Sequence, residues 1–89
     1  MTEEKLTKYL AITKQALEQI QAHINKPLSK EAVMVLDMAT RYFQDSQHFR
    51  KKGDYINAFA CLNYAHGWLD AGASLKLFDV HDNRLFIVD

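Results

Sequence analysis

Three polar side chains in a strongly apolar segment are the first candidates for chemistry in this sequence. Asn63, His66 and Asp70 are spaced by three and four residues, so a helix would place them on one face. A histidine with an aspartate four residues away could provide two metal ligands, or a general base and its orienting carboxylate. A catalytic zinc needs three protein ligands, and the nearest further donors belong to other predicted elements. We therefore favour a structural interpretation, in which His66 and Asp70 bond each other, and we expect no metal and no cofactor.

Arg41 and His48 form a second candidate pair, because seven positions along a helix return to nearly the same side. Arginine followed by histidine after six residues faintly resembles the motif of helical nucleotide-binding and ribonuclease domains from toxin pairs, where the two residues act on a phosphodiester. Asp37 and Asp45 flank Arg41 closely enough to neutralise it. Such alternation of charge is typical of an exposed helix, so we interpret this face as salt-bridged. A small RNA-processing or nucleotide-binding domain using Arg41 and His48 is the alternative function.

The cysteine and the aromatic residues of the same apolar segment suggest packing rather than reaction. Cys61 has no His or Lys at helical spacing to lower its pKa, so we interpret it as a small buried hydrophobe. Tyr64 and Trp68 could be ordinary core residues beneath the C-terminal tail, or the centre of an interface, where large aromatics are enriched. The candidate interface residues are Tyr64, Trp68, Leu75 and Phe86.

Hydrophobic residues spaced by three and four predict three helices, at about residues 3–25, 30–52 and 55–77. Helices of this length with short connections pack antiparallel. The predicted fold is therefore all-α: a single domain, residues 1–89, forming a three-helix up-down-up bundle.

Local signals predict where these helices begin and end. Pro27 ends the first helix, because residues that precede proline avoid the α region. Ser29 is the expected N-cap of the second helix. Gly53 should cap the C-terminus of the second helix, and Asp54 should cap the N-terminus of the third.

The last residues, 78–89, are predicted to form a short extended tail that packs on the bundle. Four consecutive apolar residues, Leu85 to Val88, need cover, and Tyr64, Trp68 and Leu75 offer the large apolar surface that could supply it. Whether the tail packs on its own chain or is exchanged with a second chain is left open; exchange would give an obligate dimer.

Composition excludes several classes of protein. Lys plus Arg and Asp plus Glu each count 11 in 89 residues, so no overall field attracts nucleic acid or an anionic membrane. No apolar run approaches the roughly 20 residues of a membrane span, and the acidic start of the chain differs from a secretory signal. One cysteine cannot form an internal disulfide. We expect a cytoplasmic protein with no membrane and no nucleic acid among its partners.

Most of the chain, and most strongly the segment from Tyr42 to Phe78, also resembles a known family. The motifs that carry the resemblance are Gly53-Asp54-Tyr55, Ala58-Phe59-Ala60-Cys61 and the run from Asn63 to Gly72. They are similar to the family numbered three hundred and fifty-seven among the domains of unknown function, which are short archaeal proteins. The resemblance implies a small helical bundle, an archaeal source and no assigned activity or catalytic residues. Our leading hypothesis is a non-enzymatic protein–protein interaction module that binds an unknown protein or a second copy of itself.

Overall fold

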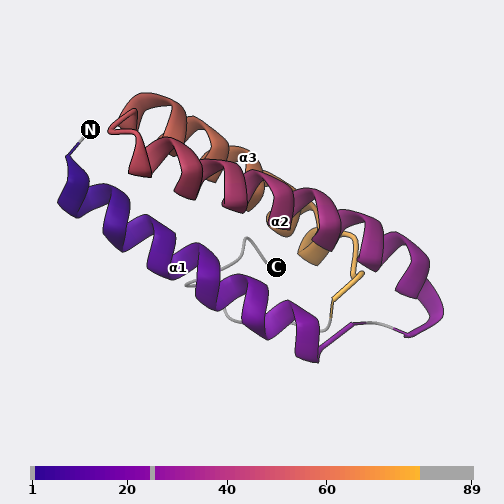
Figure 1. Ribbon diagram of the computed structural model, residues 1–89. Coiled ribbons are helices and arrows are strands. Elements are labelled where there is room, and N and C mark those ends of the chain that lie inside the picture. The colour runs from indigo at the N-terminus through magenta and orange to yellow at the C-terminus, as the bar shows by residue number, and fades with distance from the viewer. Residues whose placement is uncertain (1, 25, 79–89) are drawn as a thin grey trace.

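The computed structural model describes residues 2–24 and 26–78 of the chain. These residues form three α-helices and one short 3-10 helix (Figure 1), with no strand among them. The elements are α1 (Glu3–Ala22), η1 (Lys26–Leu28), α2 (Ser29–Lys51) and α3 (Tyr55–Ser74). The predicted all-α bundle of three long helices is confirmed.

Contacts between the helices establish the up-down-up order. Arg50, near the end of α2, donates a hydrogen bond of 2.7 Å from its guanidinium to the Thr7 hydroxyl near the start of α1, so these helices are antiparallel. The rings of Tyr9 in α1 and Phe59 in α3 lie 5.6 Å apart, near the starts of both helices, so α1 and α3 are parallel. The most extensive contact joins α2 and α3.

The core lies between the three helices and follows the predicted stripes. Each helix turns most of its large apolar residues inward, because burial removes apolar surface from water and contributes about 25 cal/mol per Å². Ser46 is a polar member of this core: its hydroxyl donates a 2.6 Å hydrogen bond to the Ala58 carbonyl of α3. The buried hydrophobic residues of the helices are Leu6, Leu10, Ala16, Leu17, Ile20, Ala32, Val35, Ala39, Phe43, Ala58, Leu62, Ala65, Leu69 and Ala73.

The turn between α2 and α3 has the predicted chemistry. Gly53 adopts φ 78°, a left-handed conformation that glycine tolerates without a steric penalty. The amides of Gly53 and Asp54 donate to the carbonyls of Arg50 and Phe49, which completes a Schellman motif at the end of α2. The carboxylate of Asp54 then accepts a hydrogen bond from the amide of Asn57, so this residue also caps α3. Both predicted caps are confirmed.

The third helix ends earlier than the predicted residue 77. Its last residue is Ser74, and Lys76 adopts φ 63°. The amides of Lys76 and Leu77 donate to the carbonyls of Ala73 and Gly72, which is again a Schellman motif, here with lysine at the left-handed position. Because no glycine marks this position, the sequence pattern predicted that the helix continues to about residue 77, beyond its observed end at Ser74.

The first connection also differs from the prediction. α1 ends at Ala22 rather than near residue 25, and the His23 ring nitrogen Nδ1 lies 2.8 Å from the Gln19 carbonyl oxygen in its last turn. Ile24 then leaves the helix to form an isolated antiparallel bridge with Phe78. Ser29 is the first residue of α2 and not its N-cap; Leu28 holds that position without a side-chain hydrogen bond, since η1 leads directly into α2.

Phe78 closes the open end of the bundle. Its side chain is 2% exposed, and its ring lies directly against the backbone of Gly72. A Cβ atom at residue 72 would overlap this ring and would lie 3.1 Å from Cγ1 of Val35. Glycine at residue 72 therefore makes room for Phe78. The rest of the predicted tail, residues 79–89, lies outside the described residues.

Candidate functional site

The outer side of α3 differs in charge from the outer sides of the other two helices. α1 and α2 carry charged residues in most of their turns, whereas Asp70 is the one Asp, Glu, Lys or Arg residue in α3. A surface helix usually turns charged and polar residues to solvent. The exposed side of α3 instead carries Ala60, Asn63, Gly67 and Ala71, with the larger Tyr64 beside them.

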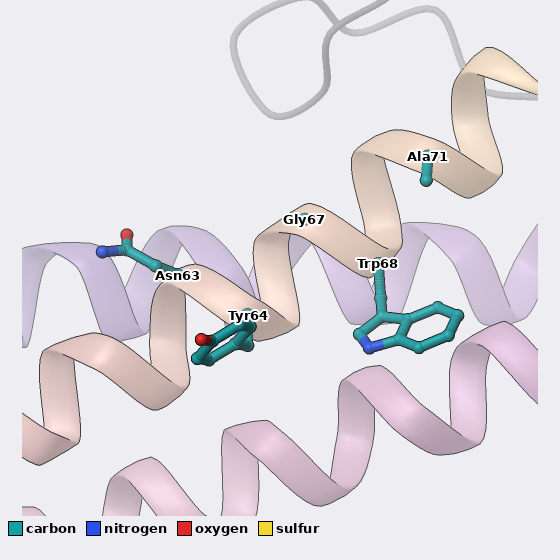
Figure 2. A pocket seen from close by; sticks show the side chains of 5 residues that line it. All are labelled: Asn63, Tyr64, Gly67, Trp68 and Ala71. Carbon is teal, nitrogen blue, oxygen red and sulfur yellow. The ribbon is translucent and has the colours of Figure 1, made fainter.

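A shallow hollow lies in the middle of this surface. It encloses about 260 Å³, is open to solvent, and is lined by Asn63, Tyr64, Gly67, Trp68 and Ala71. Figure 2 shows Tyr64 and Trp68 projecting on the side toward α2, and Asn63 projecting on the other side. Gly67 lies between them and has no side chain, and a Cβ placed there would meet nothing within 4 Å. The lining offers apolar contact, an amide, a phenol and an indole, and no charge.

The aromatic residues of the hollow are braced by α2. The ring of Tyr64 stacks on that of Tyr42 in α2, with centroids 5.4 Å apart and planes inclined by 27°. Tyr64 is nevertheless 62% exposed, and Leu75 beyond the helix end is 66% exposed. Trp68 is half-buried against the core. Three predicted interface residues, Tyr64, Trp68 and Leu75, thus lie along one flank of α3; the fourth, Phe86, lies outside the described residues.

The three polar side chains that the sequence placed on one face, Asn63, His66 and Asp70, differ in how far they are buried. Asn63 is exposed and lines the hollow, whereas His66 and Asp70 are half-buried. The Nδ1 atom of His66 is buried and has no hydrogen-bond partner in the described part of the chain. Nδ1 is therefore not the nitrogen that bonds Asp70, and a bond through Nε2 stays a prediction. Among residues 2–24 and 26–78, no group of three His, Cys, Asp or Glu side chains could hold a metal ion.

The second candidate pair lies on the outer side of α2. Nε of Arg41 is 3.1 Å from a carboxylate oxygen of Asp37, which confirms the predicted salt bridge for this pair. His48 is exposed and packs edge-on against Phe49, with ring centroids 6.1 Å apart. Seven residues of helix separate Arg41 from His48 by about 10 Å along the axis. The helix thus brings Arg41 to an acidic partner and not to the histidine.

Cys61 is a half-buried free thiol between the core and the aromatic flank. Burial raises the pKa of this thiol, and the negative charges of Asp45 and Asp54 raise it further. A raised pKa keeps the sulfur protonated and weakly nucleophilic at neutral pH. The direction agrees with the interpretation of Cys61 as a packing residue, although its side chain is less buried than we expected.

Gly67 is the residue of this site that the sequence analysis missed. Glycine inside a helix costs about 0.5–1 kcal/mol relative to alanine, so its presence in the middle of α3 was a usable signal. The near-absence of charge between Tyr55 and Ser74 was a second signal. Both point to the exposed side of α3, whereas the periodicity that we followed reports the buried side.

Comparisons with known proteins place the chain in a family. The family described as "Protein of unknown function (DUF357)" matches residues 8–78, which span all of α2 and α3 and most of α1. No curated protein and no solved structure matches the chain. Among the described residues, no helix has the length and apolar character that a membrane span needs. Because the family model matches most of the chain, this protein belongs to the DUF357 family.

Proposed function

We propose that this protein is a non-enzymatic interaction module that binds a helix of another protein chain on the outer side of α3. We call this surface the docking face; it comprises Ala60, Asn63, Tyr64, Gly67, Ala71 and Leu75. The observation that carries the proposal is the uncharged hollow at Gly67 beside a tyrosine that is 62% exposed. A large side chain held by stacking yet left open to solvent has apolar surface to offer a partner.

The shape of the docking face favours a helix as the bound element. Its small residues recur along the axis of α3, and small side chains allow two helix backbones to approach closely. Tyr64 and Trp68 form one wall of the hollow along the same axis (Figure 2). A partner helix with an uncharged face would therefore bury Tyr64 without leaving an unpaired charge.

The same proposal includes a cytoplasmic location and an archaeal source. The free thiol of Cys61 suits a reducing compartment. The archaeal source rests on the family resemblance.

Site-specific photocrosslinking tests the docking face. A photoreactive phenylalanine derivative replaces Ala71 on the docking face, and the matched control carries it at Gln15, which is exposed on α1. Irradiation in extract of the source cell should give discrete adducts from residue 71 and none from residue 15. Mass spectrometry of the adducts should identify a helical segment with an uncharged face.

Competition makes the test specific. Excess unlabelled protein should abolish the adduct, whereas excess Gly67→Glu protein should not, because a carboxylate in the hollow would be desolvated by the partner. Adducts of equal yield from residues 15 and 71, or competition by both proteins, would refute a docking face on α3. The absence of any adduct from residue 71 would refute it as well.

A further inference from the structure

The direction of the chain at Phe78 is fixed by two features that follow α3. Lys76 adopts φ 63°, which turns the chain back after the helix ends. Phe78 then forms an antiparallel bridge with Ile24, just beyond the end of α1. The two segments of an antiparallel bridge run in opposite directions. Since the chain at Ile24 leaves α1, the chain at Phe78 points back along the bundle.

α3 has two flanks along which a returning segment could lie. The flank with Tyr64 faces α2, whereas Phe59 is on the flank that faces α1, where its ring lies 5.6 Å from that of Tyr9. His66 follows Phe59 by seven residues and so lies on the same flank. Ile12 follows Tyr9 by about one turn of α1. We call the surface formed by Tyr9, Ile12, Phe59 and His66 the α1–α3 seam, and all four residues are half-buried.

The bridge selects the seam rather than the flank of Tyr64. α1 and α3 are parallel, so their ends lie at the same end of the bundle. Between Ser74 and Phe78 the chain crosses from the end of α3 to the end of α1, where it meets Ile24. A segment that starts there and points back along the bundle lies between α1 and α3.

The sequence after Phe78 contains an apolar run at a matching distance. Leu85 to Val88 are four consecutive apolar residues, and the first of them follows Phe78 by seven residues. An extended chain spans about 3.3 Å per residue, so Leu85 can lie up to about 23 Å from Phe78. The same distance is the rise of about 15 helical residues, which leads from Ile24 back to Tyr9. Ile12 lies within this reach.

We propose that residues 79–89 of this chain occupy the α1–α3 seam, with Leu85 to Val88 packed against Tyr9 and Ile12. The contact is made within one chain, and it holds together two helices that no short turn connects. The inference goes beyond the proposed function, because the seam and the docking face are on different flanks of α3. The docking face therefore stays open to a partner while the tail is in place.

A spin label on the tail tests where it packs. In a Cys61→Ala background, Arg84→Cys carries a nitroxide next to the apolar run. The nitroxide weakens the nuclear magnetic resonance signals of amides near it, and the effect falls steeply with distance. The amide signals of Ile12 and His66 should lose most of their intensity. Circular dichroism checks that the labelled chain is folded.

The same spectrum contains the control. Tyr42 and Tyr64 stack on the flank of α3 that faces α2, so their amide signals should be weakened much less than those of the seam. A stronger loss at Tyr42 and Tyr64 than at Ile12 and His66 would place the tail on the other flank and would overturn the inference. A similar loss throughout the chain would show that the tail occupies no fixed site, and would overturn it as well.

A mixed sample tests whether the tail packs on its own chain. Spin-labelled chains without isotope label are mixed in urea with isotope-labelled chains that carry no spin label, and the two are refolded together. The signals of Ile12 and His66 should then keep their intensity, because each tail lies on its own bundle. Loss of these signals in the mixture would show that tails are exchanged between chains and would overturn the inference.

A double-mutant cycle tests the contact without a label. Replacement of all four residues from Leu85 to Val88 by serine should raise the equilibrium constant for unfolding at least about tenfold. In an Ile12→Ser background the same change should have a much smaller effect, because the contact is already lost. The matched control is Val33→Ser, an exposed apolar residue of α2, which should leave the effect unchanged. An equal effect in both backgrounds would overturn the inference.

Discussion

Replacement of Gly72 by alanine is the sharpest test of how the bundle is closed. Alanine is the better helix former by up to about 1 kcal/mol, so propensity alone predicts a gain in stability. The structure predicts a loss, because the new methyl group would overlap the ring of Phe78 and crowd Val35. Overpacking of this kind costs about 1–3 kcal/mol. We therefore expect Gly72→Ala to lower the free energy of unfolding by about 1–2 kcal/mol.

Gly67 provides the matched control for this prediction. It lies in the same helix, and a Cβ there meets nothing within 4 Å, so Gly67→Ala should raise stability by about 0.5–1 kcal/mol. Urea unfolding followed by circular dichroism would measure both changes. Opposite signs are the expected result, although the two substitutions are chemically identical.

A double-mutant cycle identifies Phe78 as the cause. Phe78→Leu removes the ring while it leaves an apolar side chain at this buried position. In that background, Gly72→Ala should be nearly neutral, which corresponds to a coupling of about 1 kcal/mol or more between the two positions. If Gly72→Ala is as stabilising as Gly67→Ala, or if it costs the same with and without the ring, then Phe78 does not occupy the site that we describe.

Other predictions test the cross-helix bond, the two Schellman motifs and the thiol. Ser46→Ala should cost about 1 kcal/mol in urea unfolding through loss of a buried hydrogen bond, whereas Ser29→Ala, which removes no cap, should cost under about 0.5 kcal/mol; equal costs would contradict both assignments. Both Gly53 and Lys76 have a left-handed backbone, which glycine adopts without a steric penalty and other residues do not. Gly53→Ala should therefore destabilise the fold by about 1–2 kcal/mol, whereas Lys76→Gly should stabilise it by up to about 1 kcal/mol. Changes of the same sign would refute this. Cys61 should react with iodoacetamide more slowly in the folded chain than in urea at the same pH, because its raised pKa lowers the thiolate fraction; an equal or faster rate in the folded chain would show that the pKa is not raised.

The fold was largely predictable because its determinants are local. The three-and-four spacing of apolar residues reports which side of each helix is buried, and this holds in all three helices. Gly53 and Asp54 mark their turn by residue type, because a left-handed backbone favours glycine and a free helix end favours aspartate.

The errors occurred where a distant contact overrides the local pattern. α1 stops short of residue 25, and Ile24, just beyond its end, pairs with Phe78, more than fifty positions away in the sequence. The end of α3 is set by the same residue, since the ring of Phe78 must reach Gly72, and the chain reverses at Lys76 to bring it there. Lysine is not a residue that predicts a left-handed conformation. A sequence pattern records propensity and burial, and neither quantity contains this pairing.

At residue 67, the stability of a single folded chain does not explain the choice of amino acid. The position is exposed and helical, and a Cβ there would meet nothing within 4 Å, so alanine would fit and would make a better helix. The folding of one chain therefore gives no reason for glycine there. The same holds for the uncharged residues around it, since lysine or glutamate on an exposed helix side would be tolerated at a cost within about 0.5 kcal/mol. A contact that requires a close backbone approach does give a reason, because any side chain at residue 67 would hold a facing helix away from Tyr64 and Ala71. We therefore expect the uncharged composition of the outer side of α3 to be explained by the contact proposed for it and not by what the inner side buries.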